Sequence, residues 1–144
     1  MQRADDAVVQ EFSVTDGDAG PYAITTGGDG ALWLTLVHSG EIARLTVDGA
    51  VDRYPTGLGP SIIAAGADEA LWFTRSGDDR IGRITLDGEQ SEFELPSGSG
   101  PFGICAGPDE SMWFTQMHTD RIGRITLDGR ITHFDLPGRA PSRP

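Results

Sequence analysis

The chain has 144 residues and a formal net charge of −11, because 22 acidic residues oppose 11 basic ones. Binding a nucleic-acid backbone needs a basic surface, so this balance argues against nucleic acid as a partner. Twenty glycines and nine prolines favour a turn-rich β protein, and the single cysteine excludes both an internal disulfide framework and a cysteine-based metal cluster.

The sequence lacks two features that would direct a protein to a membrane or out of the cell. The opening residues, MQRADDAVVQEF, lack the apolar run of a signal peptide. Nowhere does the sequence reach the roughly 18 consecutive apolar residues that indicate a membrane span. We therefore expect a cytoplasmic protein without a membrane partner.

The first predicted element is a strand at residues 8–14, VVQEFSV, whose pattern matches the last strand of the later repeats. Residues 20–58 then form a first unit of four short strands, at 22–26, 32–35, 42–47 and 51–54. Asp48-Gly49 lies between the last two strands and predicts a type I′ hairpin turn, in which both central residues have positive φ.

The same pattern recurs over residues 59–99 and 100–137, with Trp33, Trp72 and Trp113 about 40 residues apart. Four antiparallel strands in about 40 residues are typical of a β-propeller blade. The predicted fold is therefore all-β, with three four-stranded blades within residues 1–137, one extra outer strand at 8–14, and a disordered tail at 138–144.

Ring closure is the problem that this organisation raises, because propellers usually have about four to eight blades. A lone arc of three blades would expose two apolar blade faces. Two copies would supply six blades, so we predict that the chain's partner is itself, in a six-bladed homodimer. The alternative left open is an incompletely folded fragment that aggregates.

Five motifs recur in order in each unit: Gly-Pro-x-x-Ile, Leu-Trp-Phe-Thr, Ile-Gly-Arg-Ile-Thr, Asp-Gly and Glu-Phe-x-Leu-Pro. Over residues 8–137 the chain resembles the streptogramin B lyases, also called virginiamycin B lyases, and looks like their first three blades. The resemblance implies a seven-bladed propeller that opens the lactone of a cyclic depsipeptide by elimination, assisted by Mg²⁺.

The resemblance also implies where catalytic histidines would stand, directly after the proline that starts an inner strand. The matching positions are occupied by Tyr22, Ser61 and Phe102. We therefore assign no catalytic residue and no metal ligand in this chain, and Mg²⁺ is implied by the resemblance alone. Enzymatic activity remains an open alternative.

Blade topology predicts a functional end, because the loop before the first strand and the turn between the second and third strands lie on one side of a blade. This side forms a channel mouth, suited to a small cyclic peptide or another small ligand. The candidate ligand-binding residues there are Tyr22, Ser61, Phe102, Arg75, Gln116, His38 and His118.

Each of these residues also has a less specific interpretation than ligand binding. The two hairpin histidines fit a purely solvated role, and Tyr22 and Phe102 fit a role in filling the channel end. Arg75 has Asp78 and Asp79 nearby as ion-pair partners. Cys105 is expected to be a buried small apolar residue. Arg44, Arg83 and Arg124, which recur once per unit, are expected to connect neighbouring blades.

Three functions are compatible with the sequence. The chain is a lyase, a binding module that holds a peptide or sugar without turnover, or an assembly unit without a ligand.

Overall fold

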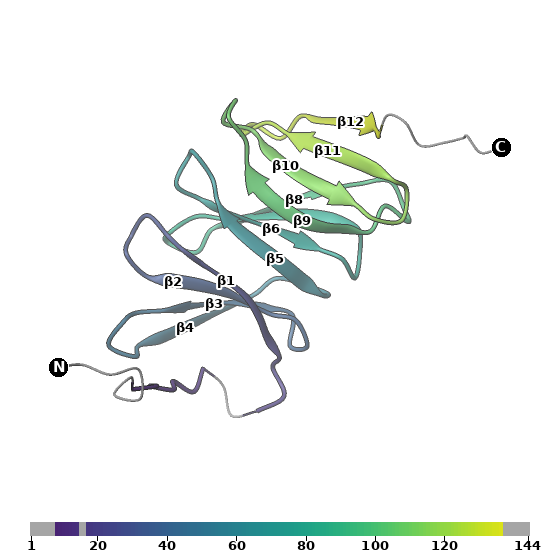
Figure 1. Cartoon of the computed structure of the whole chain (residues 1–144). Helices are drawn as coiled ribbons and strands as arrows, with labels where there is room; N and C mark the ends of the chain where they lie inside the picture. Colours follow the sequence, from purple (N-terminus) through teal and green to yellow (C-terminus); the bar gives the residue numbers. More distant parts are fainter. Residues whose placement is uncertain (1–7, 15–16, 137–144) are drawn as a thin grey trace.

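The structure is a computed structural model that describes residues 8–14 and 17–136. These residues form twelve strands in three four-stranded antiparallel sheets, and contain no helix (Figure 1). The strands are β1 (Pro21–Thr26), β2 (Leu32–Leu36), β3 (Glu41–Leu45), β4 (Val51–Pro55), β5 (Pro60–Ala65), β6 (Leu71–Arg75), β7 (Arg80–Ile84), β8 (Gln90–Glu94), β9 (Pro101–Ala106), β10 (Met112–Gln116), β11 (Arg121–Ile125) and β12 (Ile131–Asp135).

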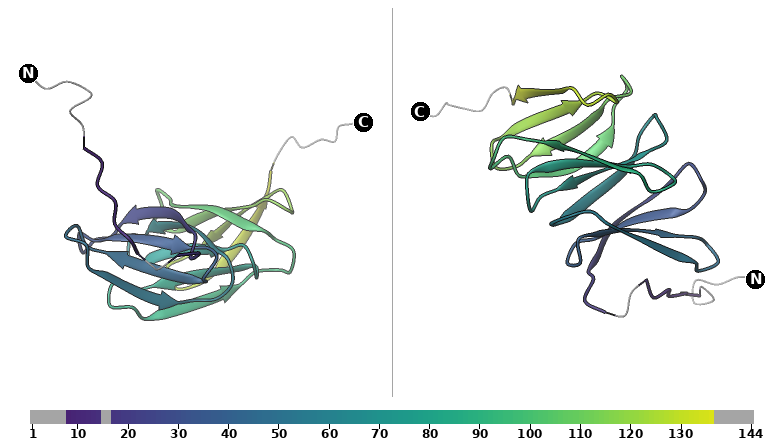
Figure 2. Two further views of the ribbon diagram at one scale, coloured as in Figure 1. Left: turned by 90° about the horizontal axis from the view of Figure 1, so that it is seen from below. Right: turned by 180° about the vertical axis from the view of Figure 1, so that it is seen from behind.

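Each sheet is an up-and-down meander, so that blade 1 is β1–β4, blade 2 is β5–β8 and blade 3 is β9–β12. The first strands of the three sheets, β1, β5 and β9, lie side by side. The sheets stack face to face along the chain, as the view from behind shows (Figure 2). The three predicted blades are confirmed, with strand ends within one or two residues of the expected positions.

Residues 8–14 differ from the prediction, because they form no strand in this structure. An outer strand needs the free edge of a third blade strand, and β3, β7 and β11 already have β4, β8 and β12 on that edge. Val8 and Val9 are accordingly exposed, while Val14 lies against blade 1. The tail predicted at 138–144 lies outside the described residues.

The Asp-Gly hairpins are placed as predicted but are not type I′ turns. In the first, only Gly49 has positive φ (98°). Gly49 N donates to Thr46 O (3.0 Å) and Thr46 N donates to Ala50 O (2.9 Å). Compared with a type I′ hairpin, the turn therefore contains one extra loop residue, and glycine occupies its left-handed position.

The blade tryptophans lie at the junctions between sheets. Trp33 and Trp72 are fully buried, and each stacks on an aromatic ring of its own outer strand, Tyr54 or Phe93, at 5.9 Å between ring centroids. Apolar side chains of the next blade, Ile63 for the first junction, complete these cores. Burial between blades thus provides the main apolar core of the chain.

An aspartate, a tryptophan and an arginine form one cluster inside each blade. In blade 3, Asp109 accepts hydrogen bonds from Trp113 Nε1 (2.9 Å) and Arg124 Nε (2.8 Å), and the Arg124 guanidinium lies 5.9 Å from the centre of the Trp113 ring. Blades 1 and 2 repeat the cluster with Asp29 and Asp68. The prediction that the repeated arginines connect blades is therefore wrong, because each one pairs within its own sheet.

These bonds predict acid sensitivity. Hydrogen bonds from Trp113 and Arg124 lower the pKa of Asp109 from 3.8 to about 2. Since the folded state holds the carboxylate more strongly than the unfolded state, the resulting stability is present above about pH 4 and is lost as pH falls through about 2. We expect the unfolding free energy to fall less over this range in Asp109→Asn. Urea titrations between pH 4 and 2 measure both slopes, and identical slopes would contradict the assignment.

Candidate functional site

One end of the sheets carries the predicted channel mouth. Antiparallel order places the loops before β1, β5 and β9 next to the β2–β3, β6–β7 and β10–β11 turns. The same backbone bond ties loop to turn in each blade: Val37 N to Gly20 O (2.9 Å), Ser76 N to Gly59 O (3.1 Å) and Met117 N to Gly100 O (3.0 Å). We call this end the mouth end, and it is a rigid, repeated frame.

Tyr22 and Phe102 come together at this end, although β5 lies between their strands. Their rings meet edge to face, with centroids 6.3 Å apart and planes inclined by 62°. Tyr22 is 57% exposed and Phe102 is half-buried. The pair therefore offers an accessible aromatic surface beside the inner strands, which can contact an apolar ligand group.

His38 and His118 occupy equivalent turns and have the same local packing. Each is exposed, and its ring covers the glycine that precedes the inner strand. A Cβ on Gly20 would lie 2.6 Å from His38 Nδ1, and one on Gly100 would lie 2.5 Å from His118 Nδ1. The two histidines thus shape the mouth while their outer edges stay accessible.

A hollow of about 340 Å³ adjoins His38. It lies between the β2–β3 turn and the loop from β4 to β5, and Pro55 and Leu58 supply much of its apolar wall. Leu58 is exposed. Sequence reasoning placed this loop at the mouth but missed Leu58, because the equivalent residues of the other units are Ala19 and Ser99 and no repeated motif marks the position.

Three candidate residues have partners inside the protein. Ser61 Oγ bonds to Ser76 Oγ (2.9 Å) and Gly59 O (3.0 Å), and Gln116 Nε2 bonds to His133 Nδ1 (2.8 Å). Arg75 pairs with Asp78 and, at 2.6 Å, with Glu92. All three candidates are at least nine-tenths buried.

Arg75 thus forms an ion pair with Asp78, which was the alternative to a role in ligand binding. Its hydrogen bond to Glu92 lowers the pKa of that carboxyl group. Arg75 Nε, Thr56 Oγ1 and Asp78 Oδ1 are nevertheless buried without a hydrogen-bond partner. Thr56 and Arg75 line a separate hollow of about 140 Å³. Arg80 also pairs with Glu92 and with Glu94, so the carboxylates of Asp78, Glu92 and Glu94 leave the Arg75–Arg80 cluster without a net positive charge for an anion.

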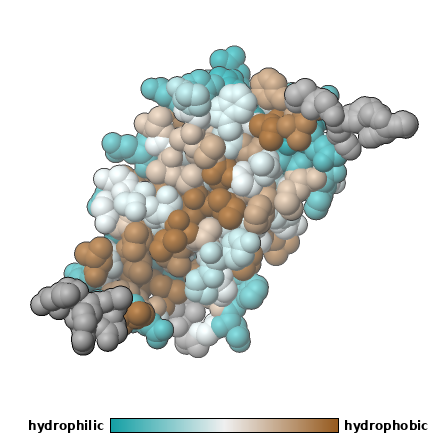
Figure 3. All heavy atoms as spheres, viewed as in Figure 1, coloured by the Kyte–Doolittle hydropathy of each residue, from teal (hydrophilic) through white to brown (hydrophobic). Residues whose placement is uncertain are grey.

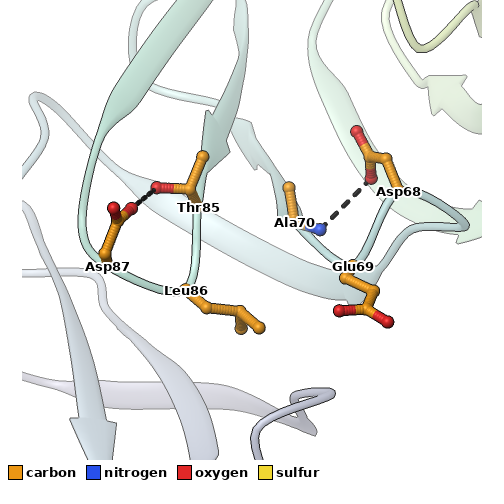
Figure 4. A pocket seen from close by; sticks show the side chains of 6 residues that line it. All are labelled: Asp68, Glu69, Ala70, Thr85, Leu86 and Asp87. Atoms are coloured by element: carbon orange, nitrogen blue, oxygen red, sulfur yellow. Dashed lines mark hydrogen bonds between the residues drawn. The ribbon is translucent and has the colours of Figure 1, made fainter.

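A larger hollow, of about 360 Å³, opens at the opposite end of blade 2, between its two turns (Figure 4). Its two aspartates already have structural partners: Asp68 accepts from Ala70 N (3.2 Å), and Asp87 accepts from the Thr85 hydroxyl. Equivalent aspartates occupy the same turns of the other blades. This repetition indicates turn geometry, so the mouth end is the better candidate site.

The described residues form no cluster of metal ligands. Within residues 8–14 and 17–136, no group of three or more His, Cys, Asp or Glu side chains could hold a metal ion. The described residues thus offer no cluster of three such ligands for the Mg²⁺ that the resemblance implies. The described residues also contain no helix of the length and hydrophobicity required to cross a membrane.

Three four-stranded meanders with adjacent inner strands, and with loops converging at one end, define a β-propeller protein. The sequence pattern of the Virginiamycin B lyase family matches residues 7–143. The chain belongs to this family.

Solved structures agree with this assignment. The chain superposes on virginiamycin B lyase from Staphylococcus aureus with a TM-score of 0.88 and 39% identity, over 94% of this chain and 48% of that one. A catalytically inactive histidine-to-alanine variant of virginiamycin B lyase from S. aureus, with quinupristin, gives the same TM-score at 40% identity, over 94% and 47% of the two chains.

Sequence relatives match over shorter segments. Virginiamycin B lyase of Streptomyces coelicolor is 58% identical over 50 residues, which are 34% of this chain and 17% of that protein. That of Mycobacterium sp. strain KMS is 67% identical over 36 residues, or 25% and 13% of the two. The chain spans about half the length of the solved lyases that it matches.

Proposed function

We propose that this chain binds a cyclic peptide of the streptogramin B type at its mouth end and does not turn it over. The observation that carries the proposal is the Tyr22–Phe102 pair on β1 and β9, whose ring centroids lie 6.3 Å apart and of which Tyr22 is exposed and Phe102 half-buried. Family membership and the quinupristin complex of a relative support the choice of ligand class. The hollow beside His38 offers room for a side chain of the peptide.

Binding without turnover follows from the residues at the inner-strand starts. Elimination needs a base at the proton next to the ester carbonyl and a group that stabilises the developing negative charge. Ser61 is buried in hydrogen bonds, and Tyr22 and Phe102 are aromatic. These positions supply surface and shape for a ligand, but no imidazole base.

The binding proposal predicts the effect of removing one ring. Tyr22→Ala should weaken quinupristin binding about ten-fold, which is the effect of losing about 1.4 kcal/mol of contact energy. Isothermal titration calorimetry measures the change. Phe12→Ala is the matched control, because Phe12 is also an exposed aromatic residue but lies beside Gly49 at the opposite end. Equal affinities of both variants and the unmodified chain would refute the site.

Lyase activity is the second candidate, and family membership favours it. His38 and His118 are the accessible imidazoles of the mouth end. Reversed-phase chromatography of quinupristin incubated with the chain, with and without Mg²⁺, separates the two functions. Elimination opens the ring without changing the mass, whereas hydrolysis adds one water. A ring-opened product that disappears in His38→Ala or His118→Ala would replace the binding proposal.

A further inference from the structure

The two junctions inside the chain follow one pattern. The tryptophan face of one blade packs on the back face of the next blade. The tryptophan faces consist of Trp33, Thr35 and Ile42 in blade 1, Trp72, Thr74 and Ile81 in blade 2, and Trp113, Thr115 and Ile122 in blade 3. The back faces consist of Ile24, Leu34 and Leu45, then Ile63, Phe73 and Ile84, then Ile104, Phe114 and Ile125. The buried clusters contain the apolar members of these faces at both internal junctions.

Among the described residues, nothing covers the tryptophan face of blade 3. Thr35 and Thr74 are fully buried, whereas Thr115 is exposed. Trp113 is only half-buried, and its stacking partner Phe134 is 42% exposed. Cys105, which pairs directly with Trp113 across β9 and β10, is exposed as well. The expected burial of Cys105 is therefore wrong, because it required a further blade on this face.

Blade 1 leaves part of the complementary back face open. Ile24 is 60% exposed, while its equivalents Ile63 and Ile104 are 4% and 8% exposed. Val14 and Ala19 cover the middle of the face, around Leu34 and Leu45. In the space-filling view, apolar atoms reach the surface over blade 1 and again beside the C-terminal trace (Figure 3).

A hydrogen bond across each junction defines its register. Thr35 Oγ1 donates to Ser61 O (2.8 Å), and Thr74 Oγ1 donates to Phe102 O (2.7 Å). Thr115 Oγ1 accepts the usual bond from Gly103 N within its blade (2.8 Å), but the described residues place no following blade beside it. The carbonyl equivalent to those of Ser61 and Phe102 belongs to Tyr22.

We propose that a second copy of this chain covers these faces head to tail. The tryptophan face of blade 3 packs on the back face of blade 1 of the second copy, and Thr115 Oγ1 donates to Tyr22 O there. Ala19 stays bonded to the β2–β3 turn through His38 N, as Ser99 does to His118 N at the junction between blades 2 and 3, and only Val14 moves aside. The same contact formed twice closes a ring of six blades, within the usual range of about four to eight.

Oligomeric mass and thiol protection test this interface. Light scattering after size exclusion should give twice the 15.3 kDa chain mass as concentration rises. Labelling of Cys105 by a thiol reagent should slow at least ten-fold over the same range, because the dimer buries this thiol. Thr115→Arg should leave a folded monomer with fast labelling at every concentration, since Thr115 is exposed in the single chain.

Thr119→Arg is the matched control, because Thr119 is an exposed threonine in the β10–β11 turn, away from the tryptophan face. It should dimerise as the unmodified chain does. A monomer with constant Cys105 labelling at all concentrations would overturn the proposal. Masses that grow without limit would overturn the closed ring, and a dimer unaffected by Thr115→Arg would overturn the interface.

Discussion

Replacing Trp72 by alanine is expected to lower the free energy of unfolding by about 3–5 kcal/mol, the range for losing a large buried aromatic side chain. Trp72 is fully buried between blades 2 and 3 and stacks on Phe93. Its Nε1 donates to Asp68 (3.2 Å), and Arg83 lies over its ring. The substitution removes all of these contacts and leaves a cavity. Urea unfolding followed by far-UV circular dichroism measures the loss.

Trp113→Ala is the internal control for this prediction. Trp113 has the same kinds of partner within its blade, Asp109, Arg124 and Phe134, but the part of the chain that the structure describes places no following blade over it. We expect the free energy of unfolding to fall by about half as much as in Trp72→Ala. The substitution removes the contacts within the blade, but it removes little apolar surface that is buried between blades. The Thr115→Arg background keeps the measurement on the monomer. Equal losses for both tryptophans would show that inter-blade burial is not the source of the stability.

Replacing Gly82 by alanine is expected to cost about 1–3 kcal/mol, through overpacking of the blade 1–blade 2 core. A Cβ at Gly82 would lie 2.2 Å from the tip of the Phe73 ring, which lies opposite it across β6 and β7. Phe73 is itself buried in the core between blades 1 and 2, so a shift of its ring would disturb other core side chains. The unfolding midpoint in urea reports the change.

Blade 1 contains a residue pair in which a smaller side chain accompanies the alanine. At the equivalent position of blade 1, Ala43 lies opposite Leu34. Phe73→Leu should therefore recover much of the stability lost in Gly82→Ala, and a double-mutant cycle measures this coupling. Gly103→Ala is the control, since its Cβ would meet Thr115 Oγ1 at 3.4 Å. Its effect should stay within about 0.5 kcal/mol. Independent, additive losses at Gly82 and Phe73 would contradict the packing explanation.

Much of the mouth end could be predicted from the sequence, because an up-and-down blade places alternate turns at the same end. The accessibility of individual side chains could not. Arg75 is three residues after Trp72 and so faces the opposite side of its sheet, into the junction with blade 1. There the loop at Gly57 packs on its guanidinium, and Asp78 and Glu92 neutralise it. No local pattern joins Gly57 and Glu92 to Arg75.

The sequence by itself determined the repeat, the strands and their order, because alternation, glycine turns and the tryptophan spacing are local and act within each unit. Only the tertiary structure decided which copy of a repeated residue is buried. Trp72 and Trp113 have the same partners within their blades, yet one is fully buried and the other is not. Likewise, residues 8–14 match a strand but find no free edge. The reason is physical: burial and strand pairing depend on what lies across a junction, and that neighbour is remote in the sequence.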